Sequence, residues 1–244
     1  MARSEAEHWL LRLGGMAAIV GSLLGMVGNL IHPATPINDP QGVASVIAAS
    51  DGWTPVHLAI VVGIALMMGG LVAIRHAIPD GLAGALARFG MVAGVVGGAI
   101  GLLLVILDGV AARQLSQEWV VASADEQDVA LALVHANETI NFALASLFNL
   151  VFAAATFILF GLAMVFSDRF TSWLGWIAVA AGVLSAAAGT IQAAVGEPTE
   201  ASRILTIVGP TVITAWLLAV GLLLLRETKE RGIGPVAAEA RSAA

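Results

Sequence analysis

This chain has no cysteine and very little charge. None of its 244 residues is Cys, and only 11% are charged. The absence of Cys excludes disulfides, thiolate metal sites and cysteine nucleophiles. Soluble domains carry about 25% charged residues, so this chain has too little polar surface for a water-soluble protein of its size.

Several enzyme motifs are also missing from the sequence. It holds no phosphate-binding glycine loop, no Gly-x-Ser-x-Gly and no His-Glu-x-x-His. The commonest sequence signatures of soluble nucleotide-binding enzymes, serine hydrolases and zinc proteases therefore do not apply.

Long apolar stretches dominate what is present. About 20 apolar residues in a helix, at about 1.5 Å per residue, cross a hydrocarbon core of about 30 Å. The sequence predicts an all-α bundle of six transmembrane helices in a single domain, residues 1–230, followed by a short tail, 231–244. The predicted spans are roughly 9–31, 55–75, 86–108, 141–166, 173–195 and 204–225.

The distribution of Arg and Lys predicts the orientation. Nine of the eleven lie on the side of the N-terminus, and cytoplasmic loops hold the excess of positive charge. We therefore expect both termini in the cytoplasm. Ten Arg against one Lys, in a chain rich in Ala, Gly and Val, is typical of a high-GC bacterium, which predicts the bacterial inner membrane. Ten of the seventeen acidic residues fall on the outer side and disfavour nucleic acid as a partner.

The outer loops contain helix-start signals. Asp39-Pro40 is typical of an N-cap followed by Pro, and predicts a short interfacial helix over 41–50. Ser123 and Glu126 form a capping-box pattern, which predicts a helix of about 40 residues that projects beyond the bilayer. Gly209-Pro210 is expected to kink the last span or to mark its start.

The odd-numbered spans share a pattern of small residues. Residues 12–21, 88–97 and 173–182 align at their Gly and Ala positions and recur at similar intervals along the chain. The alignment predicts three helical hairpins in parallel orientation. The alternative is that membrane helices converge on small residues because their backbones must approach closely.

Ionisable residues gather at one depth near the outer surface. The interval from Arg12 to His32 along the chain equals the interval from Arg88 to Asp108. His57 precedes Arg75 by nearly the same interval, which places it at a similar height because the rise of a helix per residue is constant. The other polar candidates for a ligand-binding site are Asn29, Glu138, Asn141 and Gln192.

Four interpretations of these residues stay open. His32, His57, Asp108 and Glu138 are a ligand set that suits Zn²⁺ or another divalent metal, which would activate water for hydrolysis. Two of them, His32 and His57, would bind a haem if they faced each other. In the third interpretation, these side chains form hydrogen bonds to an organic ligand. In the fourth, they are ordinary polar residues at the level of the lipid headgroups.

Short motifs carry a resemblance to a known set of proteins. They are Asp39-Pro40 before a short helix, Trp53 with Pro55-Val-His57-Leu58 at the entry to the second span, and Leu174-Gly-Trp176 opening a late helix. By these motifs the chain resembles a loosely defined family of bacterial multi-pass membrane proteins of unknown function. The resemblance implies a membrane bundle and transfers no catalytic residue.

Three functions follow as hypotheses. The first is a protein that binds a small amphipathic or lipid-like ligand in a cavity open to the outer side. The second is an intramembrane metal-dependent hydrolase or acid–base lipid enzyme. The third is a permease. The expected partners are membrane lipids, with a second copy of the chain or a larger membrane complex also open.

Overall fold

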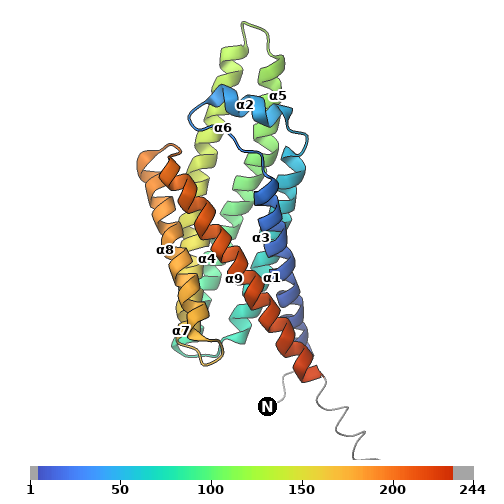
Figure 1. Ribbon diagram of the computed structural model, residues 1–244, viewed down its shortest axis with the longest axis vertical. Coiled ribbons are helices and arrows are strands. Elements are labelled where there is room, and N and C mark those ends of the chain that lie inside the picture. Colours follow the sequence, from blue (N-terminus) through green and yellow to red (C-terminus); the bar gives the residue numbers. More distant parts are fainter. Residues whose placement is uncertain (1–4, 233–244) are drawn as a thin grey trace, which may run out of the picture.

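The computed structural model describes residues 5–232, which contain helices and no strand (Figure 1). Two π-helical segments, η1 and η2, interrupt otherwise continuous helices. In chain order the elements are α1 (Glu5–Ile31), α2 (Pro40–Ala49), α3 (Trp53–Ala77), α4 (Leu82–Ile106), η1 (Leu107–Ala111), α5 (Ala112–Val121), α6 (Gln127–Phe148), η2 (Asn149–Thr156), α7 (Phe157–Val165), α8 (Ser172–Val195) and α9 (Glu200–Gly232).

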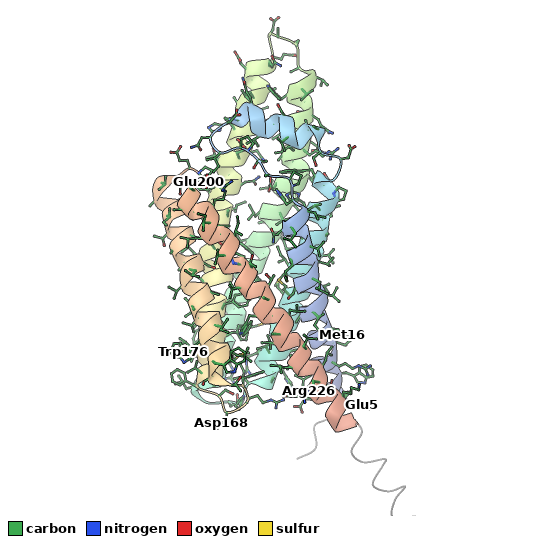
Figure 2. The ribbon with its side chains drawn as sticks, in the orientation of Figure 1. Glu5, Met16, Asp168, Trp176, Glu200 and Arg226 are labelled. Carbon is green, nitrogen blue, oxygen red and sulfur yellow. The ribbon has the colours of Figure 1, made fainter. Side chains whose placement is uncertain are left out.

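Six helical segments in this range are long and apolar enough to cross a membrane, which confirms the predicted fold class. We call the end with α2 and the α5–α6 turn the outer end, and the opposite end the inner end. Figure 2 shows Glu5, Asp168 and Arg226 at the inner end, and Glu200 toward the outer end. The threefold repeat and the direction in the membrane stay predictions, and the tail beyond Gly232 lies outside the described residues.

The spanning segments pack as a closed ring. Going round it, α3 packs on α1, α1 on α9, α9 on α8, α8 on α7, and the α6–α7 segment on α4, which returns to α3. Large side chains fill the middle, among them Leu71, Phe157, Phe160 and Leu217, each fully buried. The ring is therefore a packed bundle whose first and last spans are neighbours.

Glycines set the spacing between neighbouring helices. A Cβ added to Gly21 of α1 would lie 2.7 Å from the carbonyl oxygen of Gly63 in α3. The same holds between α7 and α8, where a Cβ on Gly161 would lie 2.5 Å from the Gly175 carbonyl oxygen. Small residues allow such close backbone approach, which takes the place of the hydrophobic effect in a membrane.

Two of the spanning segments are much longer than a bilayer requires. They comprise 40 residues (Leu82–Val121) and 39 residues (Gln127–Val165), or about 60 Å each against a core of about 30 Å. The prediction of a helix of about 40 residues is confirmed for the segment that contains the fourth span. The third helix continues well past residue 108, where the predicted span ends. The residues that follow, in η1 and α5, are more polar but remain helical up to Val121.

The short helix α2 lies across α5 and α6 (Figure 1). Its N-cap is Asp39, whose side chain accepts a hydrogen bond of 2.9 Å from the Gly42 amide, as predicted. Val43 and Ile47 face inward and join Trp53 and Ala112 in a small buried cluster. Through this cluster, α2 connects the hairpin formed by α5 and α6 to the start of α3.

Two helix starts differ from the sequence patterns. The Ser123 hydroxyl pairs with the Glu126 carboxylate at 2.8 Å instead of capping the helix, which begins at Gln127. Pro210 lies inside α9, which begins ten residues earlier at Glu200, so it does not mark the start of the span. The nearby Thr214 hydroxyl donates to the Pro210 carbonyl at 2.6 Å.

The second half of the ring contains an amide cluster, formed by Asn149, Gln192 and Thr206. The Asn149 side-chain amide donates to the Gln192 side-chain carbonyl at 2.9 Å, and the Gln192 amide donates to the Thr206 hydroxyl at 3.1 Å. These bonds join η2, α8 and α9. Within a membrane, buried polar side chains form hydrogen bonds with one another across helices. The cluster is consistent with that role, which is to hold neighbouring helices together.

Candidate metal centre

His57 is fixed one turn into α3. Its side chain is buried, and Nδ1 lies 2.7 Å from the carbonyl oxygen of Trp53. A carbonyl accepts but does not donate, so Nδ1 carries the proton and donates it there. In the neutral ring the other nitrogen, Nε2, is then an acceptor with a free lone pair.

His32 follows directly after the last residue of α1 and repeats this arrangement. Its Nδ1 lies 2.9 Å from the Pro33 carbonyl oxygen, which again leaves Nε2 as the free nitrogen. The ring is half-buried and packs on the indole of Trp53, with centroids 4.7 Å apart. Burial lowers the pKa of His32 below its usual value, and the neighbouring His57 lowers it further. A lowered pKa favours the neutral form of the imidazole, which is the form that ligates metals.

Asp108 belongs to the π-helical segment η1. Its Oδ2 lies 3.2 Å from Nε2 of His57, and 36% of its side chain is exposed. Two bonds tie this backbone to α3: the Trp53 indole N–H donates to the Asp108 carbonyl, and the Thr54 hydroxyl to the Gly109 carbonyl, both at 2.7 Å. π-Helical turns are frequent at functional sites, and this one carries the only carboxylate in contact with His57 among the described residues.

The three side chains converge on one point. Nε2 of His32 lies 3.2 Å from Nε2 of His57, and the ligand atoms of all three residues lie within 4.8 Å of one another. Two nitrogens at that distance share either a proton, in a hydrogen bond, or a metal ion, because two bare lone pairs would repel each other. Ligand atoms on a tetrahedral metal with bonds of about 2.0–2.1 Å are about 3.3 Å apart. The His32–His57 and His57–Asp108 distances, both 3.2 Å, are close to that spacing, whereas the ligand atoms of His32 and Asp108 lie within 4.8 Å of each other and would have to approach to share one ion.

The arrangement favours a metal ion over haem. Two axial ligands on opposite sides of one iron are about 4 Å apart and face each other across the porphyrin plane. Here the two nitrogens are 3.2 Å apart and share their site with a carboxylate. A donor set of two imidazoles and one carboxylate suits zinc and also non-haem Fe(II).

The other predicted site residues lie outside this triad. Asn29 is exposed and donates to the carbonyl of Gly25 in its own helix. Glu138 lies 3.9 Å from His135, although it is close enough to Asp108 to interact with it electrostatically. Asn141 is half-buried and Gln192 belongs to the amide cluster. The ligand-binding roles of these four residues stay predictions.

Sequence reasoning missed the residues that support the triad. Trp53 stood out in the sequence but not as a support of the triad, and neither Thr54 nor Gly109 stood out at all. Arg113 also has a role here: its guanidinium donates to the Ser50 carbonyl and pairs with Asp51. It thereby joins α5 to the turn before α3, the helix that carries His57.

Comparisons of the chain with protein-family models, with curated proteins and with solved structures find no match. The function is therefore argued from the geometry of the three side chains and their surroundings.

Proposed function

We propose that this membrane protein holds one divalent metal ion of the zinc type at the outer end of its bundle, and uses it to activate water for hydrolysis. The ligands are Nε2 of His32, Nε2 of His57 and the carboxylate of Asp108. The observation that carries the proposal is the convergence of these atoms while both Nδ1 nitrogens are bonded to backbone carbonyls.

The supporting bonds are of the kind that metal sites use. A ligating His almost always donates its second N–H to a carbonyl or carboxylate, which fixes the tautomer and the ring orientation. Both histidines do so here, at 2.9 Å and 2.7 Å. One such bond is common in any helix, but two on rings that face each other indicate a prepared pair of ligands.

The number of ligands favours catalysis over a structural role. Structural zinc sites use four protein ligands, whereas catalytic sites use three and leave one position for water or substrate. The described residues provide three, and the exposed side of Asp108 faces the surroundings. A zinc-bound water has a pKa of about 7, so hydroxide forms at neutral pH. The location at headgroup depth favours an ester or phosphoester of an amphipathic molecule as substrate.

Metal binding is the first test. The protein, purified without chelators, is titrated with Co²⁺, whose visible absorption reports tetrahedral coordination, and its zinc content is measured by mass spectrometry. We expect one ion per chain, lost in His57→Ala and strongly weakened in Asp108→Asn. The matched control is His76→Ala, an exposed histidine at the inner end. Equal metal content in all variants would refute the site.

Hydrolysis is tested separately with nitrophenyl esters and nitrophenyl phosphodiesters in detergent. We expect turnover that disappears with a chelator, returns with Zn²⁺ and is absent from His57→Ala. A protein that binds one zinc ion without hydrolysing either class would keep the metal site and overturn the catalytic part of the proposal. The remaining function would then be binding of an amphipathic ligand at the ion.

A further inference from the structure

A second site lies at the inner end, on the lipid-facing side of α3 and α4. A shallow, wide-open depression of about 370 Å³ lies there, with two arginines and apolar side chains along it, and we call it the groove. It lies at the opposite end of α3 from His57 and shares no residue with the metal ligands. The groove is lined by Arg75, Arg88, Met91, Val92, Val95 and Val96.

The two guanidinium groups gather around one carboxylate. Arg88 donates to the Asp80 carboxylate at 2.6 Å, and a nitrogen of Arg75 lies 4.0 Å from the same oxygen. Arg75 is also positioned by a bond of 3.4 Å to the Ile78 carbonyl, and only 23% of its side chain is exposed. Two positive charges against one negative charge leave the group with a surplus of one positive charge.

The apolar walls have the dimensions of an acyl chain within one leaflet. Val96 lies a little over two turns beyond Arg88 on α4, a rise of about 12 Å, against about 15 Å for half of the hydrocarbon core. Val92 is 62% exposed and Val96 is 50% exposed, so both side chains face outward from the bundle. Guanidinium groups beside an apolar groove of this length match the phosphate and the chain of one lipid molecule.

We propose that this groove binds an anionic glycerophospholipid, with its phosphate on Arg75 and Arg88 and an acyl chain along Val92 and Val96. Arginine pairs with phosphate through forked, charge-assisted hydrogen bonds. Asp80 competes with the phosphate for the same donors and sets the affinity. The inference stands on its own observations and does not depend on the metal centre.

The test is native mass spectrometry of the full chain, titrated with phosphatidylglycerol and with phosphatidylcholine of the same acyl chains. We expect preferential retention of phosphatidylglycerol. Each arginine near an anionic lipid surface contributes about 1 kcal/mol, so Arg75→Gln with Arg88→Gln should weaken retention about 30-fold, at about 1.4 kcal/mol per factor of ten. Arg12→Gln is the matched control, since Arg12 is an exposed arginine of the inner end that stacks on Trp9.

For a third variant, Asp80→Asn, we expect the opposite effect on lipid retention. Asp80→Asn removes the competing carboxylate from an 84% exposed side chain, so it should raise retention of phosphatidylglycerol without disturbing the fold. A merely structural role of the Arg–Asp group would not produce that gain. Unchanged or weaker retention in Asp80→Asn, or equal retention in the double arginine variant, overturns the proposal. Complete displacement of the lipid by millimolar inorganic phosphate would also overturn it, because the arginines would then select a free anion.

Discussion

Gly109 offers a way to disturb the proposed metal centre without changing any of its three ligands. A Cβ added there would lie 2.7 Å from Cγ of His57 and closer still to its Cβ. Carbon atoms pack at about 3.5–4.0 Å, so Gly109→Ala must separate η1 from α3 by more than about 1 Å. Metal–ligand distances tolerate only about 0.2 Å, so Asp108 would no longer reach the ion together with both histidines.

Gly109→Ala has two opposing effects on the free energy of unfolding. Alanine is favoured over glycine in a helix by up to about 1 kcal/mol, and Gly109 is not at a positive φ that would oppose it. Overpacking costs about 1–3 kcal/mol, so the net loss of stability should be about 0–2 kcal/mol. Metal affinity should fall further, by about 10–100-fold, as it does when the support of a ligand is removed.

The assay is a zinc titration against a competing chelator dye, combined with thermal unfolding in detergent. The control is Gly52→Ala, which lies just before α3, has φ of −79° and meets nothing within 4 Å of the added Cβ. We expect wild-type zinc affinity for the control and weak binding for Gly109→Ala. Tight zinc binding by Gly109→Ala would show that the contact between η1 and α3 does not position the ligands.

Four further outcomes are expected. Trp53→Phe removes the indole donor that holds η1, which should cost about 1 kcal/mol of unfolding free energy and weaken zinc binding about tenfold in the same titration. Gly21→Ala places a Cβ 2.7 Å from a carbonyl of α3 and should cost about 1–3 kcal/mol, whereas Gly69→Ala, with its nearest contact at 3.4 Å, should leave the unfolding temperature unchanged. Gln192→Leu breaks the amide cluster and should cost about 1 kcal/mol or less, a test of whether the cluster is adhesion alone. Chelation should remove about 2.7 kcal/mol of stabilisation at a metal concentration about 100 times Kd, and His57→Ala should not respond to it.

Height along the bundle axis could be predicted from the sequence, because a helix rises by the same distance with every residue. Counting from the inner arginines placed His32, His57 and Asp108 at one height, and the structure brings these three together. Gln192 was a further polar candidate for the same site, but it lies in the other half of the ring. Residue spacing determines height along an axis, whereas the angular position around the bundle depends on which helices become neighbours.

The π-helical turn at Asp108 could not be predicted from the sequence pattern. It adds one residue to a turn and so rotates every later side chain about the helix axis. No apolar periodicity indicated it, since Leu107 and Val110 fit either geometry. The length of the third helix was missed for a related reason. A helix that leaves the bilayer can continue in water, so loss of apolar character at residue 108 marked an interface and not an end.

The order of the ring has a consequence for biogenesis. All three proposed ligands lie between residues 32 and 108, so they are synthesised before the fourth span begins, whereas the ring closes only when α9 packs against α1. An ion captured at that stage would hold the first three spans together while the chain is still being made. The amide cluster, whose members lie between residues 149 and 206, would join the later helices in the same way. Each half of the bundle thus carries its own polar crosslink, completed in the order in which the ribosome synthesises it.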